Sequence, residues 1–139
     1  MPAAAHIEET TVHRLLVGKT CSVGFGVAFI ACIAALAALA WFPAGAVTRT
    51  ALGGHAVHFI AWLGTTIVMG LTCQGRPRLA QAVLLIVYAA VLEVGQFQAS
   101  GRHPSLHDFA FSAAGVLLGS GLVWLARRCW LRSGSRPAR

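Results

Sequence analysis

Acidic residues are nearly missing from this chain, which has four Asp and Glu among its 139 residues. Only 11% of the residues are charged, 57% are hydrophobic, and the mean hydropathy is +0.71. So little charge argues against a water-soluble globular domain. The composition is that of an integral membrane protein.

Several functional signatures are also missing. The sequence has no phosphate-binding loop, no dinucleotide-binding fingerprint and no Gly-x-Ser-x-Gly nucleophile elbow. It also lacks the alternating pattern of membrane barrel strands. Cys21, Cys32, Cys73 and Cys129 lack the close spacing of metal or redox motifs. The membrane topology predicted from the Lys and Arg counts places none of them on the oxidising face, so free thiols are expected.

Long apolar runs are what the sequence has in abundance. Four apolar runs have lengths close to the ~20 residues that a helix needs to cross a bilayer. They predict helices at residues 21–42, 55–72, 79–97 and 107–126. The first run is longer than the core of a cleaved signal peptide, so we expect a retained helix. The predicted organisation is an all-α, four-helix membrane bundle at 21–126, between an amino-terminal segment (1–20) and a basic tail (127–139).

The positive charge indicates which way the helices cross. The net charge is +7, and five of the eleven Lys and Arg residues lie in the tail. Because cytoplasmic segments are rich in Lys and Arg, both termini are predicted to lie in the cytoplasm. Attraction to anionic membrane lipid explains the tail better than nucleic-acid binding does.

The predicted topology brings polar residues to one level. The second helix starts at the outer face, the third ends there and the fourth starts there. The polar residues at this level are His55, His58, Glu93, Gln96, Arg102, His103, His107 and Asp108. We therefore expect them to form one outward-facing site.

Helical spacing sharpens this expectation, because residues three or four apart share a face. His55 and His58 share one face, and Glu93 and Gln96 share another. A third face carries a stripe that should point into the bundle, made of Asp108, Ser112, Gly115 and Gly119. A carboxylate within a membrane helix needs a partner, and for Glu93 the candidates are Arg102, His58 and Gln96. Arg102 is a candidate partner for Asp108 as well.

The order and spacing of these residues resemble the pattern of VanZ-like membrane proteins. The matching segments are His55-Ala-Val-His58-Phe59, Glu93-x-x-Gln96, Gly101-Arg102-His103-Pro104 and Asp108-x-x-x-Ser112-x-x-Gly115-x-x-x-Gly119, within roughly residues 41–126. The resemblance implies a small multi-pass bacterial membrane protein without an assigned molecular activity. Many members have Asp-Lys where this chain has Gly53-Gly54, and Asn where it has Ser112.

Four interpretations of the cluster stay open. It could bind a lipid-linked or cell-envelope ligand, with Arg102 and His103 contacting a phosphate or carboxylate. It could catalyse hydrolysis or transfer, with Glu93, His58 and Asp108 as acid or base. It could serve only to lock the helices together. The predicted ligand-binding residues are His55, His58, Glu93, Gln96, Arg102, His103, Asp108 and Ser112.

A metal site is the fourth interpretation. No cofactor is predicted, although His55, His58, Glu93 and Asp108 are the residue types that could hold zinc. A serine triad from Ser105, His107 and Asp108 is a weaker option, because a triad is defined by geometry rather than by closeness in sequence.

Overall fold

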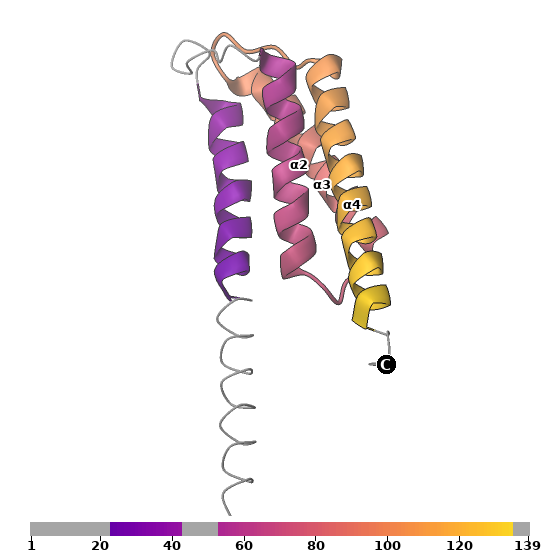
Figure 1. Ribbon diagram of the computed structural model, residues 1–139. Coiled ribbons are helices and arrows are strands. Elements are labelled where there is room, and N and C mark those ends of the chain that lie inside the picture. The colour runs from indigo at the N-terminus through magenta and orange to yellow at the C-terminus, as the bar shows by residue number, and fades with distance from the viewer. Residues whose placement is uncertain (1–22, 43–52, 135–139) are drawn as a thin grey trace, which may run out of the picture.

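The fold is all-α in the part of the chain that is described, residues 23–42 and 53–134 of this computed structural model. The first helix is Val23–Trp41. It is followed by α2 (Gly54–Thr72), α3 (Arg78–Gly95), a short 3₁₀ helix η2 (Gln96–Gln98) and α4 (Leu106–Gly134). The long helices run side by side as a bundle (Figure 1). The predicted four-helix bundle is confirmed.

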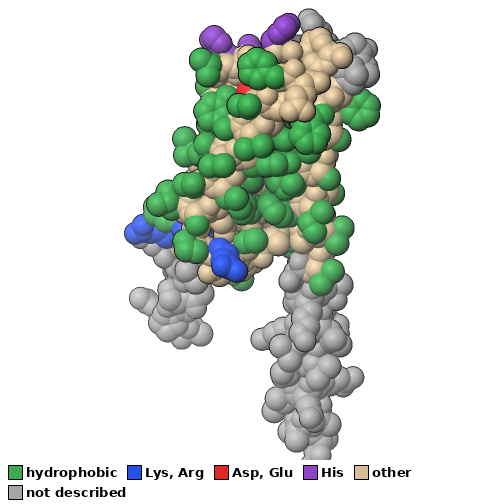
Figure 2. Space-filling model, turned by 180° about the vertical axis from the view of Figure 1, so that it is seen from behind, with side chains coloured by type: hydrophobic (Ala, Val, Ile, Leu, Met, Phe, Trp, Pro, Cys, Tyr) green, Lys and Arg blue, Asp and Glu red, His purple; other side chains and the backbone are tan. Residues whose placement is uncertain are grey.

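Each long helix has the length and composition of a membrane span. Within the described residues the spans are Val23–Trp41, Gly54–Thr72, Arg78–Gln98 and Leu106–Trp130. Apolar side chains cover much of the outer surface between the two ends (Figure 2). In a bilayer every backbone polar group must be satisfied internally, which a helix does within itself. The chain is therefore a multi-pass membrane protein, while its sidedness stays a prediction.

Two glycines allow α2 and α4 to pack closely. A Cβ added to Gly115 would lie 2.5 Å from the Phe59 carbonyl oxygen of α2, and one added to Gly119 would lie 2.8 Å from Cβ of Thr66. No side chain fits in either place, so only glycine permits this approach. The predicted inward stripe on α4 is confirmed, and next to Gly115 the side chain of Val116 is fully buried.

The first helix is held by apolar packing and by two hydrogen bonds to its backbone. Its side chains that pack on the buried core are Phe29, Ile33, Leu36 and Ala37. The Tyr88 hydroxyl on α3 donates to the Ile33 carbonyl (3.0 Å), and the Thr72 hydroxyl on α2 donates to the Phe25 carbonyl (3.0 Å). The first helix therefore belongs to the bundle.

Helix α4 is longer than predicted, because it continues past Ala126 to Gly134. The guanidinium of Arg127 donates to the carbonyl oxygens of Gly70 and Gln74 near the end of α2. This contact places Arg127 inside the helical packing instead of in a separate tail. The predicted segment 1–20, Cys21, the loop at 43–52 and the tail at 135–139 lie outside the described residues.

The start of α2, the end of α3 and the start of α4 lie at the same end of the bundle (Figure 1). We call this the polar end, because it carries His55, Glu93 and Asp108. The opposite end, which we call the arginine end, carries Arg76, Arg78, Arg127 and Arg128. The expected convergence of distant polar residues at one level is confirmed.

Candidate functional site

The start of α4 is capped jointly by its own sequence and by α3. Ser105 is the N-cap residue: its hydroxyl accepts the Asp108 backbone N–H (3.3 Å). In a capping box the third helical residue, here Asp108, returns a bond to the N-cap backbone N–H. Here Glu93 takes that role, because its Oε1 accepts the Ser105 N–H at 2.6 Å. Glu93 thereby links α3 to α4 and places negative charge at a helix start, where it is stabilising.

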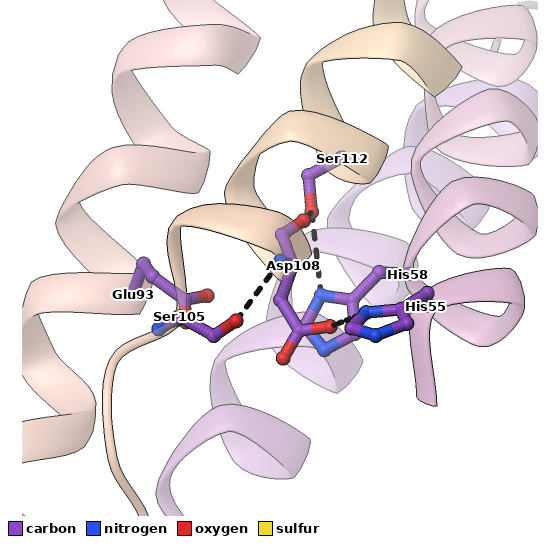
Figure 3. Close-up of polar contacts among 6 residues, drawn as sticks. All are labelled: His55, His58, Glu93, Ser105, Asp108 and Ser112. Atoms are coloured by element: carbon purple, nitrogen blue, oxygen red, sulfur yellow. Dashed lines mark hydrogen bonds and ion pairs between the residues drawn. The ribbon is translucent and has the colours of Figure 1, made fainter. Parts of the chain in front are cut away.

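Because Glu93 completes the cap, the carboxylate of Asp108 is available to α2. His55 Nδ1–H donates to Asp108 Oδ1 at 2.7 Å, an ion pair when the imidazole is protonated (Figure 3). The His55 ring also stacks on Phe111, with ring centroids 5.2 Å apart. The pair is partly accessible, since His55 is exposed and Asp108 is half-buried.

A second link between α2 and α4 joins His58 to Ser112. The buried Ser112 hydroxyl donates its only hydrogen to the Asp108 carbonyl oxygen, at 2.8 Å. Its oxygen then accepts from His58 Nδ1–H, at 3.3 Å (Figure 3). With Nδ1 as the donor, Nε2 of a neutral His58 is left with a free lone pair.

Glu93 and Gln96 are the most deeply buried polar groups at this end after Ser112, with exposed fractions of 8% and 5%. Glu93 has one hydrogen bond to the described residues, the bond from Ser105. The Gln96 side chain, just beyond α3 in η2, has no hydrogen bond to any described residue. Among the described residues, Nε of Arg78 is the only buried side-chain nitrogen or oxygen without a partner, so the Gln96 amide keeps accessible surface and is free to bond to a molecule in the cavity described below.

Arg102 pairs with neither carboxylate among the described residues, contrary to the expectation. Its Nε donates to the Phe42 carbonyl oxygen at 2.9 Å, immediately after the first helix ends. The backbone at a helix end offers carbonyl groups without intrahelical partners, and Arg102 satisfies one of them. The carboxylates are meanwhile bonded to Ser105 and His55.

The other two histidines of the described residues lie outside the cavity. His103 and His107 are exposed, and neither lines the cavity described below. His107 lies beside His55, with ring centroids 6.1 Å apart. Ser105 acts as a helix cap, so the serine triad considered from the sequence has no geometric support among these residues.

A cavity of about 800 Å³ lies among the first helix, α2, α3 and α4. That volume is within the range of small-molecule sites. Its polar wall is formed by His55, His58, Glu93, Gln96, Arg102, Asp108 and Ser112. Its apolar wall is formed by Leu36, Leu39, Ala40, Val57, Ala61, Trp62, Ala89 and Leu92. Seven of the eight predicted ligand-binding residues therefore line one cavity, and His103 does not.

The zinc interpretation of His55, His58, Glu93 and Asp108 stays a prediction. Among the described residues, no group of three or more His, Cys, Asp and Glu side chains converges as metal ligands. His55 and His58 bond through Nδ1 to different α4 residues, Asp108 and Ser112. These contacts orient the two rings separately.

Two parts of the site were missed by reasoning from the sequence. The cap formed by Ser105 and Glu93 was one, although Ser-x-x-Asp at the start of an apolar run is a recognisable helix-start signal. The other was the apolar wall from the first helix. A featureless apolar run gives no sign of which of its faces lines a cavity.

These features define a multi-pass α-helical membrane protein with a mainly apolar cavity that has one polar wall, at one end of its bundle. No family model, no curated protein and no solved structure matches the chain.

Proposed function

We propose that this chain is a VanZ-like protein of the bacterial inner membrane that binds the polar head of a lipid-linked or cell-envelope ligand. The motif resemblance supports the family. The Lys and Arg distribution supports cytoplasmic termini, which would place the polar end on the outer side. The mixed cavity supports a ligand that has both a polar and an apolar part.

The observation that carries the proposal is a surplus of polar groups over what the helix links use. A lock between helices accounts for His55 with Asp108, His58 with Ser112, and Glu93 with Ser105. It does not account for Gln96, which is buried and has no hydrogen bond to the described residues. A buried polar group facing a cavity is instead what a binding site requires.

The surplus groups also describe the ligand head. The terminal nitrogens of Arg102 are donors suited to an anionic oxygen such as that of a phosphate. Glu93 is an acceptor suited to a hydroxyl or ammonium group, and the Gln96 amide offers both functions. A head that combines an anionic oxygen with hydrogen-bond donors would satisfy all three residues.

Catalysis is the second candidate function, and the orientation of His58 favours it. With Nδ1–H bonded to Ser112, His58 would present a basic Nε2 at the cavity surface. A positioned imidazole is the commonest general base in enzymes. Release of inorganic phosphate from a bound lipid phosphate, lost in His58→Gln while binding persists, would establish this function.

The decisive test of binding is Gln96→Leu, with Gln81→Leu as its matched control. Both glutamines are buried, but the Gln81 amide donates to the Cys73 (2.7 Å) and Arg76 (3.4 Å) carbonyls. Unfolding in mixed detergent micelles should show little change for Gln96→Leu. It should show a loss of about 1–3 kcal/mol for Gln81→Leu, which removes the hydrogen bonds to the carbonyls of Cys73 and Arg76.

Lipid that co-purifies with each variant, measured by native mass spectrometry, should show the opposite pattern. Gln96→Leu and Arg102→Ala should lose a bound species that Gln81→Leu keeps. If Gln96→Leu retains the full complement of bound lipid, or if it fails to fold, the binding proposal is wrong and the lock explains the cluster.

A further inference from the structure

The apolar wall of the cavity has contributions from helices on both sides of its mouth. Leu39 of the first helix and Val57 of α2 both line the cavity. Their side chains also keep a large accessible surface, with exposed fractions of 52% and 37%. A side chain that both lines a cavity and reaches the surface marks the place where the cavity opens.

This opening faces the bilayer. The first helix and α2 are both membrane spans, so side chains exposed on their flanks meet lipid rather than water. Val57 lies three residues inside the start of α2, and Leu39 lies two residues inside the end of the first helix. The opening therefore extends from the polar end, where exposed His55 also lines the cavity, down the side of the bundle to Leu39 and Val57.

The depth of the cavity fits one leaflet. From Gly54, where α2 starts, to Ala61 in the apolar wall is about 10 Å at 1.5 Å per residue. The hydrocarbon core of a bilayer is about 30 Å thick, so the cavity extends through less than one leaflet. A lipid of that leaflet has its head at the depth of the polar wall and its chains at the depth of Leu39 and Val57.

We propose that the ligand is itself a membrane lipid and that it reaches the cavity sideways from one leaflet, between the first helix and α2. The head would contact Glu93, Gln96 and Arg102, and this part rests on the proposed function. The start of a chain would lie between Leu39 and Val57 and continue into the bilayer. A water-soluble ligand would need the polar wall but would leave Leu39 and Val57 without a function in binding.

The test is site-specific photocrosslinking in native bacterial membranes. A photoreactive amino acid with a small alkyl diazirine side chain, close to valine in size so that the opening stays free, is placed at position 57 and, as a matched control, at position 91. Val91 is exposed to lipid on α3, four residues from the helix end, and does not line the cavity. Mass spectrometry of the adducts should show one lipid class enriched severalfold at position 57 over position 91. Equal adduct profiles at the two positions would overturn the proposal.

Two further variants separate this inference from the proposed function. Val57→Trp should block the opening and remove the co-purified lipid, whereas Val91→Trp should not. If Val57→Trp retains a lipid whose binding depends on Gln96 and Arg102, sideways access is wrong and the polar site stands. If the enrichment at position 57 survives Gln96→Leu and Arg102→Ala, the lateral cavity stands and the proposed recognition of the head is wrong.

Discussion

The two ends of the bundle use polar side chains in different ways. At the polar end, side chains bond to one another or to the start of α4, as His55 does with Asp108 and Glu93 does with Ser105. At the arginine end, side chains donate to backbone carbonyls: Arg127 bonds to Gly70 and Gln74, and Gln81 bonds to Cys73. Figure 2 shows His at one end and Arg at the other.

Charge sharpens this contrast. Both acidic residues of the described part, Glu93 and Asp108, lie at the polar end. The arginine end has only carbonyl acceptors for its cations among the described residues, and these are the groups that a helix end leaves without intrahelical partners. One nitrogen at the arginine end has no partner: Nε of Arg78 is buried without a hydrogen bond to the described residues. It does not line the large cavity.

This difference distinguishes a structural polar cluster from a candidate binding site. At the arginine end, the side-chain donors form hydrogen bonds with carbonyl oxygens at the end of α2 and in the following turn. At the polar end the links between helices leave the Gln96 amide, Nε2 of His58 and two guanidinium nitrogens of Arg102 without hydrogen bonds to the described residues, beside a cavity. Surplus hydrogen-bonding capacity next to a cavity, rather than the number of polar residues, distinguishes the two.

The largest expected effect comes from Gly115→Leu, which should disturb both ends together. A side chain at Gly115 would collide with the α2 backbone at Phe59 and Leu63 and force α2 and α4 apart. Overpacking of this kind should cost roughly 3 kcal/mol or more. Gly121→Leu is the control, because a Cβ added there meets nothing within 4 Å. Equal stability of the two variants in mixed micelles would show that the glycine contact does not hold the bundle.

Much of this architecture was predictable from the sequence. The four apolar runs, the proline and glycine breaks and the small-residue stripe on α4 each constrain the chain locally. The level shared by His55, Glu93 and Asp108 followed from helix order alone. The pairing of partners did not follow, because it depends on side-chain geometry. Arg102, with two carboxylates at its level, bonds instead to the Phe42 carbonyl.

Arg127→Met should have the next largest effect, confined to stability. It removes two charged donors from the carbonyls of Gly70 and Gln74, a loss of about 2 kcal/mol. Arg128→Met is the matched control, since Arg128 lies over the Trp124 ring, 5.1 Å from its centroid. An exposed contact of this type contributes about 0.5–1 kcal/mol. The amount of bound lipid, measured on folded protein, should not change in either variant. A loss of bound lipid confined to Arg127→Met would show that the arginine end affects binding at the polar end.

Asp108→Asn should have a smaller effect on stability. It removes the charge that pairs with exposed His55 and that favours the start of α4, together about 1 kcal/mol. The amide oxygen introduced by this substitution could still accept a hydrogen bond from His55. Unfolding in mixed micelles at low and high salt checks the charge contribution, which should shrink as salt rises. A loss that does not depend on salt would show that geometry, rather than charge, fixes this pair.

The smallest effect is expected from His103→Ala, although the sequence pattern places His103 in the site. His103 is exposed and does not line the cavity, and surface substitutions of this kind usually change stability by less than about 0.5 kcal/mol. Arg102→Ala, at the adjacent position, is the comparison, because Arg102 does line the cavity. Native mass spectrometry should show bound lipid retained in His103→Ala and lost in Arg102→Ala. Equal losses would mean that the site extends from the cavity onto the loop, so that the polar end would bind its ligand at the surface as well as between the helices.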